Sequence, residues 1–135
     1  MPERNRIGLD TTVVLRLLTG QPENQFSMAK TFIEKQLAQN VKFFVSDLVI
    51  SESYFALHYH YQVPKNEAVR ELLNLLSSGI IHPLPGSVAL KILKENNHHK
   101  AGLVDRIIHG QYHEHTDQVV TFDKALSALP GVIGL

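Results

Sequence analysis

The chain has 135 residues, and its 13 basic and 13 acidic side chains give a formal net charge of zero, so no overall positive field points to a polyanionic partner. Without cysteine it has no disulfide framework, no thiolate nucleophile and no thiolate zinc site. Its length predicts one domain over residues 1–135. No apolar run approaches the ~20 residues of a membrane span and the polar start does not resemble a signal peptide, so we expect a cytoplasmic protein without a membrane partner.

Strand-like and helical patterns alternate along the chain, which predicts an α/β fold with a mainly parallel sheet. Short apolar runs predict strands at residues 6–10, 42–45, 80–82, 118–122 and 132–135. Helical periodicity, bounded by glycine and proline, predicts helices at residues 12–19, 23–39, 47–61, 65–77, 87–96 and 102–113. The most polar stretch, residues 95–100, is expected to form a loop at the edge of a pocket.

Four acidic residues lie where an α/β chain gathers ligands. Asp10 ends the first predicted strand and Asp123 follows the fourth, and the carboxyl ends of parallel strands open into the crevice where such sheets bind ligands. Glu52 and Asp105 each interrupt an apolar helical stripe. Carboxylate oxygens are the hard ligands that Mg²⁺ and Mn²⁺ prefer. The pattern therefore predicts a divalent-metal pocket of the kind that hydrolyses phosphodiesters.

The two helical acids are informative because their stripes should face the core. The stripe partners are Leu48, Phe55 and Tyr59 for Glu52, and Ala101, Ile108 and Tyr112 for Asp105. A buried, isolated carboxylate has to pair, bind a cation or take up a proton. The alternative to a metal is therefore an ion pair with a nearby base, Arg106 or Lys124.

Other polar groups favour simpler roles. Asp47 follows Ser46 at a strand-to-helix junction, where either side chain can cap the helix. His109 and His113 are four residues apart and could share a zinc ion, but the motif His-Glu-x-x-His is absent and the helix should end there. We expect structural or solvent-facing roles for these histidines.

Four segments carry a family resemblance. Ile7 to Gly20, Ser46 to Glu52, Gly102 to Asp105 and Thr121 to Lys124 resemble, in order, the acidic motifs of PIN-domain ribonucleases of the VapC toxin type. The resemblance spans nearly the whole chain. It implies a PIN-like three-layer fold, with a central mainly parallel sheet flanked by helices.

The resemblance also implies an activity: a Mg²⁺- or Mn²⁺-dependent ribonuclease, commonly the toxin of a toxin–antitoxin pair. The acidic ligands of the family carry over onto Asp10, Glu52, Asp105 and Asp123. Two departures bear on activity, since position 12 is Thr12 where the family often has asparagine, and Arg106 follows the third acid where a small residue is common. They leave open an alternative, a weak or inactive PIN-like module that binds RNA or protein.

The remaining expectations concern support and partners. Thr12 and Thr121 are candidates to support the acidic ligands. Basic residues near the predicted strand ends or the polar loop are candidates to hold RNA phosphates, and the set is Arg16, Lys100, Arg106 and Lys124, with Lys91 and Lys94. The four tyrosines at positions 54, 59, 61 and 112 are weaker candidates to stack bases.

We also expect a homodimer that binds a small antitoxin protein. Two apolar faces suggest it, on neighbouring predicted helices. They comprise Phe26, Ala29, Phe32 and Ile33 on the first, and Tyr54, Leu57, His58 and Tyr61 on the second. Each of these side chains can equally belong to the core.

Overall fold

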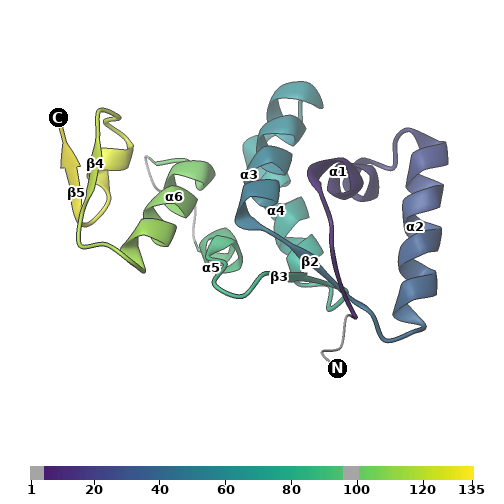
Figure 1. Ribbon diagram of the computed structural model, residues 1–135. Helices are drawn as coiled ribbons and strands as arrows, with labels where there is room; N and C mark the ends of the chain where they lie inside the picture. The colour runs from purple at the N-terminus through teal and green to yellow at the C-terminus, as the bar shows by residue number, and fades with distance from the viewer. Residues whose placement is uncertain (1–4, 96–100) are drawn as a thin grey trace. The chain divides into compact units, whose positions relative to one another are not determined.

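The computed structural model describes residues 5–95 and 101–135, so the predicted loop lies outside the described residues from position 96 to position 100. The chain divides into two compact units, Met1–Pro85 and Gly86–Leu135, and each has its own helices and its own parallel sheet (Figure 1). The predicted α/β class with parallel strands is confirmed. That residues 1–135 act as one domain stays a prediction.

The first unit contains a three-stranded parallel sheet in the order β1-β2-β3. The strands are β1 (Arg6–Gly8), β2 (Lys42–Val45) and β3 (Ile81–Pro83), each within two residues of its predicted ends. Neighbouring residues of a strand face opposite sides of the sheet. Phe43 is fully buried and meets the Phe32 ring edge-on at 6.4 Å, whereas Phe44 is half-buried with the Arg6 guanidinium 5.6 Å from its ring centre.

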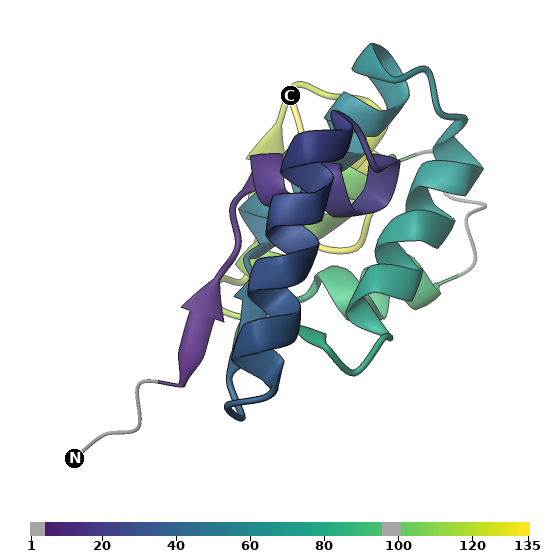
Figure 2. The ribbon, with the colours of Figure 1, turned by 90° about the vertical axis from the view of Figure 1, so that its right-hand side faces the viewer.

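Four α-helices complete this unit: α1 (Thr11–Thr19), α2 (Glu23–Leu37), α3 (Asp47–Phe55) and α4 (Lys65–Leu76). α1 ends at Gly20, whose φ of 70° is a left-handed conformation that glycine adopts without steric cost, and the Gly20 N–H donates to the Arg16 carbonyl. Figure 2 shows α2 beside β1 and α1. The core joins side chains from all layers of the unit, chiefly Val14, Phe43, Ile50, Leu57 and Leu72.

A π-helical turn, η1 (Ala56–His60), follows α3 where one continuous helix over residues 47–61 was predicted. The Tyr61 N–H donates to the Ala56 carbonyl at 3.0 Å, a five-residue step. A ring nitrogen of His58 lies 2.9 Å from the Val63 carbonyl oxygen. Leu57 is buried within this turn, as it would be in a continuous α-helix, so the pattern of apolar residues does not reveal the π-helical hydrogen bonding.

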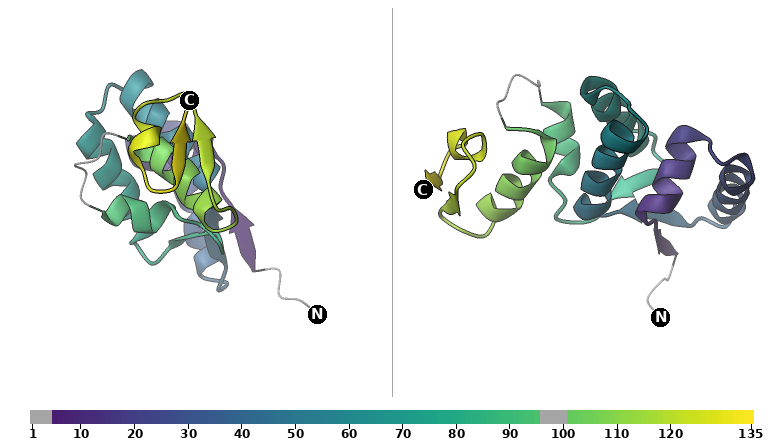
Figure 3. Two further views of the ribbon diagram at one scale, coloured as in Figure 1. Left: turned by 90° about the vertical axis from the view of Figure 1, so that its left-hand side faces the viewer. Right: turned by 90° about the horizontal axis from the view of Figure 1, so that it is seen from above.

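The second unit contains α5 (Ala89–Lys94), α6 (Leu103–His113), β4 (Val119–Thr121), a 3₁₀ turn η2 (Leu126–Ala128) and β5 (Val132–Gly134). β4 and β5 lie side by side as a parallel pair, with Val119 opposite Val132 (Figure 3). α5 begins later than predicted because the Ser87 hydroxyl accepts the Ala89 N–H at 3.3 Å. The η2 turn was not predicted.

Close helix packing stabilises this unit. A Cβ atom at Gly110 would come within 3.2 Å of the Val88 side chain and 3.3 Å of that of Ile92, so glycine allows α6 to approach α5. Leu103 and Ile107 of α6 are buried, as is Leu126 of η2. In the described parts of both units, no helix is long and apolar enough to cross a membrane.

Candidate functional site

Asp10 lies at the junction of β1 and α1, where its side chain caps the helix. Its Oδ1 accepts hydrogen bonds from the Thr12 hydroxyl at 2.7 Å and from the Val13 N–H at 3.2 Å. These two bonds, that of Thr12 first, hold the pKa of Asp10 below its usual value. Asp10 is therefore an exposed, ionised carboxylate whose Oδ1 is fixed by two hydrogen bonds.

Glu52 is tied to the same junction from α3. The Thr11 hydroxyl donates to Glu52 Oε1 at 2.9 Å, and Thr11 directly follows Asp10. α1 and α3 are in contact, so the bond joins two packed helices rather than two mobile segments. The structure thus links Glu52 to the residue that follows Asp10, and a shared role for these two acids stays a prediction.

Thr11 is a contact of the candidate site that the sequence did not predict. Its partner lies 41 positions away, and nothing in a single sequence shows that pairing. The only available signal was a hydroxyl side chain directly after a strand-end carboxylate. Thr12, in contrast, was predicted to support the acids, and its hydroxyl does hold Asp10.

The surroundings of Glu52 differ from the prediction. Its stripe partners Leu48, Phe55 and Tyr59 are 70%, 45% and 68% exposed, and Glu52 is exposed as well. The expectation that Glu52 interrupts a buried stripe was wrong. α3 is apolar on two faces, and the core takes the other one, so helical periodicity does not tell them apart.

The core face of α3 and η1 also removes a predicted interface. Tyr54 is 6% exposed and Leu57 is 2% exposed, while His58 and Tyr61 are half-buried. This strip packs inside the first unit and does not offer the free apolar face that was expected. Tyr54 is likewise too buried to stack on a base.

The other two acids lie in the second unit. Asp105 is half-buried in the first turn of α6, where a carboxylate favours the positive end of the helix. Burial, and after it the negative charge of Asp123, raise the pKa of Asp105 above its usual value. The negative charges of Asp105 and Asp123 therefore repel each other, and a cation between the two carboxylates would lower the raised pKa of Asp105.

Asp123 is fixed in the same manner as Asp10. Its Oδ1 accepts the Leu126 N–H at 2.9 Å, which caps η2, and its own N–H donates to the Thr121 hydroxyl at 3.0 Å. Thr121 was predicted to support the site, and it holds the backbone of Asp123 rather than its carboxylate. The helical stripe that carries Asp105 is only partly buried, because Ile108 is 39% exposed and Tyr112 is exposed as well.

Within the described part of each unit, no ion pair involves any of the four acids. Lys30 pairs with Glu34, and Arg106 pairs with Glu95. Arg106 is 6% exposed, with Nη1 3.7 Å from Glu95 Oε2. It does not lie on the surface, contrary to the expectation that it contacts RNA.

The other predicted phosphate contacts differ in position. Arg16 is half-buried, and its Nε donates to Gln25 Oε1 at 2.6 Å. Lys124, Lys91 and Lys94 are exposed. Lys100 lies outside the described residues.

Asp47 does not cap its helix, and His109 and His113 make contacts within the second unit. Ser46, not Asp47, caps α3 by accepting the Val49 N–H at 3.1 Å, and Asp47 is buried in the first turn. The rings of His109 and His113 stack at 5.8 Å, and His109 Nε2 lies 2.6 Å from the Pro130 carbonyl oxygen. In residues 5–95 and 101–135 no three histidine, aspartate or glutamate side chains gather in one place to hold a metal ion.

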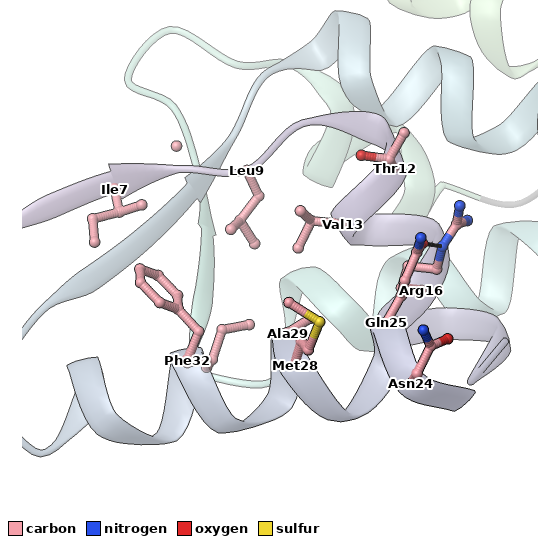
Figure 4. A pocket seen from close by; sticks show the side chains of 12 residues that line it. Ile7, Leu9, Thr12, Val13, Arg16, Asn24, Gln25, Met28, Ala29 and Phe32 are labelled. Carbon is pink, nitrogen blue, oxygen red and sulfur yellow. Dashed lines mark hydrogen bonds between the residues drawn. The ribbon is translucent and has the colours of Figure 1, made fainter. Parts of the chain in front are cut away.

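The first unit contains an apolar groove of about 550 Å³ (Figure 4). β1, α1 and α2 form it, with Leu9, Val13, Met28 and Phe32 among its lining side chains. Thr12, which holds Asp10, also lines the groove. Of the apolar face predicted on residues 25–33, Ala29, Phe32 and Ile33 take part, and Phe26 does not.

Each of the four acids is a hard oxygen donor within its own unit. Asp10, Glu52 and Asp123 each have one carboxylate oxygen engaged by a hydroxyl or a backbone N–H. Asp105 carries a charge that its surroundings disfavour. These are oxygen donors, which suit Mg²⁺ or Mn²⁺ better than zinc.

Comparison with protein families matches residues 7–132 to the family described as PIN domain. That match spans all four acidic residues and nearly the whole chain. No curated protein matches the chain.

Proposed function

The chain belongs to the PIN domain family, whose members are typically nucleases, and on that basis we propose that it is a Mg²⁺- or Mn²⁺-dependent ribonuclease with Asp10, Glu52, Asp105 and Asp123 as its acidic residues. The observation that supports this most is the bond from the Thr11 hydroxyl to Glu52, which links α3 to the residue that follows Asp10. Carboxylates that face one another repel, as Asp123 does Asp105, and such a pair favours a bound cation.

Each acid has a role in this proposal. Asp10 and Asp105 hold the cation directly, and Glu52 and Asp123 hold it through water or orient the attacking water. When bound, the cation supplies positive charge that offsets the charge developing on the phosphate oxygens and makes water more acidic. The hydroxyls of Thr11 and Thr12 keep Glu52 and Asp10 in fixed orientations, which lowers the cost of ordering them.

RNA is the substrate in this proposal, held by cations around the acidic residues. Arg16 lies one helical turn after Thr12 on α1, and Lys124 directly follows Asp123. Contacts from such residues to phosphates position the strand and carry no sequence information. The cleavage sequence therefore depends on other contacts.

Cleavage of a panel of RNAs tests the proposal. The wild type should cut RNA in Mg²⁺ or Mn²⁺ and not in EDTA, and an Asp10→Asn variant purified in the same way should be inactive. Equal cleavage by both preparations would indicate a contaminating nuclease. RNA binding without cleavage by the wild type would favour the alternative, an inactive PIN-like module, to which Thr12 and Arg106 already point.

We further propose that the protein is the toxin of a toxin–antitoxin pair and forms a homodimer. The apolar groove of the first unit supports a protein partner, because an extended apolar tail lying in it would reach Thr12 and could direct a basic side chain at Asp10. Co-expression with the product of the adjacent reading frame tests the pairing, and light scattering tests the dimer. A monomer that neither copurifies with that product nor slows growth would contradict the toxin role and leave the nuclease proposal standing.

A further inference from the structure

A polar cavity of about 600 Å³ lies at the amino ends of β1 and β2 in the first unit. Arg6 and Lys42, the first residues of the two strands, line it together with Asn5 and Asn40. All four side chains can donate hydrogen bonds, and two of them carry a positive charge. The described lining of the cavity contains no carboxylate, so the cavity suits an anion.

The sheet holds the two cations next to each other. Arg6 is the register partner of Lys42 in the parallel pair of β1 and β2. The backbones of neighbouring strands lie about 4.8 Å apart, so two positive charges in this position repel. In the described part of the first unit no ion pair involves either cation, and the pair found there joins Lys30 to Glu34. An anion bound by Arg6 and Lys42 together would offset their repulsion.

The Arg6 side chain also borders a second cavity. Its guanidinium lies 5.6 Å from the centre of the Phe44 ring, a cation–π contact that favours one position of the side chain on the sheet. The second cavity, of about 210 Å³, is lined by Arg6 and Phe44 together with Gly8, Leu84 and other residues of the first unit. The two cavities therefore adjoin at Arg6.

An extended segment connects Arg6 with the candidate acid Asp10. The Leu9 N–H donates to the Phe44 carbonyl at 2.9 Å, so pairing with β2 continues past the end of β1. Alternate residues of an extended chain face the same side, which places Arg6, Gly8 and Asp10 on one side of the segment. Gly8 is exposed, and a Cβ atom there would meet nothing within 4 Å. No side chain of the segment itself therefore blocks the path between Arg6 and Asp10.

We propose that Arg6 and Lys42 form a phosphate-binding subsite for the RNA strand whose scissile phosphate lies at Asp10. This inference rests on the proposed ribonuclease function. Four residues of extended chain span about 13 Å, which corresponds to roughly four nucleotides at about 3.4 Å each. A chain of zero net charge has no overall field that attracts RNA, so the strand needs a local pair of cations. Contacts of this kind position the strand and do not read its bases.

Glutamine substitutions test the subsite, because they remove the charge and keep a polar side chain. Binding of a labelled single-stranded RNA longer than the span from Asp10 to Arg6 is measured by fluorescence anisotropy in EDTA at several salt concentrations. The double variant Arg6→Gln, Lys42→Gln should raise the Kd about tenfold, as for one lost hydrogen bond to a charged group. It should also lower the slope of log K against log salt by about 0.7, the value for one phosphate contact to a single strand.

The matched control is the double variant Lys65→Gln, Arg70→Gln. It removes the same charge from two exposed residues of α4 that line neither cavity, and it should keep the wild-type Kd and salt slope. Gly8→Val tests the path, because it places a side chain in open space and should leave the melting temperature unchanged. This variant should weaken binding of the longer RNA as the glutamine variant does.

Cleavage separates the subsite from the acidic residues. On the longer RNA in Mn²⁺, Arg6→Gln, Lys42→Gln should have a raised KM and an unchanged kcat. On a dinucleotide, which is too short to reach from Asp10 to Arg6, the same variant should have wild-type values. A fall in kcat on the dinucleotide would show that the two residues act on the reaction itself and would overturn the subsite.

Three further results would overturn the proposal. The first is a wild-type Kd and salt slope in the folded variant Arg6→Gln, Lys42→Gln, which keeps the nuclease if the wild type still cuts RNA. The second is an equal loss in the α4 control, since net charge alone would then explain the effect. The third is stabilisation by inorganic phosphate that needs Arg6 and Lys42 while RNA affinity does not, since the cavity then takes a free anion. Binding that needs both cations, without cleavage by the wild type, keeps the subsite and removes the nuclease.

Discussion

The Thr11 hydroxyl donates to Glu52 Oε1 at 2.9 Å and so links the first turn of α1 to the middle of α3. Because Asp10 directly precedes Thr11, this bond links the two helices that carry Asp10 at the start of one and Glu52 within the other. We predict that Thr11→Val lowers kcat/KM for RNA cleavage roughly tenfold, equivalent to about 1.4 kcal/mol for one hydrogen bond to a charged group. Thr11→Ser should restore most of the activity. The control is Thr31→Val, an exposed threonine of α2, and equal losses in both valine variants would argue against a role for this bond.

Asp10→Asn and Asp105→Asn should each abolish metal-dependent cleavage while the fold is retained. Asparagine still caps a helix through its side-chain oxygen, so α1 should begin where it does now. Circular dichroism checks the fold, and cleavage in Mn²⁺ checks the activity. Inactivity accompanied by gross unfolding would indicate that the carboxylate has a structural role instead.

The two substitutions should differ in their effect on stability. Folding raises the pKa of Asp105, so its charged form destabilises the folded state, and this cost is absent below the unfolded pKa of about 3.9 and complete above the raised folded pKa. Asp105→Asn should therefore raise the melting temperature of the metal-free protein at neutral pH by a few degrees, with a gain that shrinks as the pH falls. Folding lowers the pKa of Asp10, so its charge stabilises the fold above about pH 3.9 and that stabilisation disappears as the pH falls through the lowered value.

Melting temperatures of Asp10→Asn and Asp105→Asn, measured across pH, test these two opposite effects on stability. Asp10→Asn should leave the melting temperature at neutral pH unchanged or lower it, opposite in sign to Asp105→Asn. Mn²⁺ should raise the melting temperature of the wild type, because a ligand bound only by the folded state stabilises it. A fall for Asp105→Asn at neutral pH would contradict the assignment of Asp105 as a disfavoured charge.

The histidines should be dispensable for cleavage. His109 and His113 stack on each other, and His109 contacts a backbone carbonyl. Mg²⁺ prefers oxygen ligands, so the ring nitrogens of these histidines are not expected to bind it. The double variant His109→Gln, His113→Gln should cut RNA in Mg²⁺ at a rate within about twofold of the wild type, the range of one weak polar contact. A folded double variant that is inactive, or active only with added zinc, would show that these side chains bind metal.

Much of the fold follows from local chemistry and was predictable. Gly20 and Pro64 mark where helices end and begin, and the apolar runs around Ile7 and Phe43 gave strands close to the observed ones. The site was predictable only as a set of acids, because Asp10 stands out at a strand end. Its internal arrangement was not, since the Thr11 bond to Glu52 depends on how two distant helices pack.

Two failures have a common physical cause. The faces of α3 that hold Leu48 and Ile50 are both apolar, and only tertiary packing determines which of them is buried. Arg106 looked like a surface cation, yet burial with a compensating carboxylate, Glu95, is an alternative that composition does not reveal. In both cases the sequence shows which residues are present and leaves their partners undetermined.

Arg106 also fixes the rotational setting of α6. Adjacent helical residues point about 100° apart, so with Arg106 held inside the second unit beside Glu95, Asp105 is turned to a definite bearing on the partly open side. Rotation of α6 about its axis would move the buried Arg106 guanidinium away from Glu95, so this contact opposes such a rotation. Glu95, at the end of α5, therefore contributes to the orientation of α6 and with it to that of Asp105.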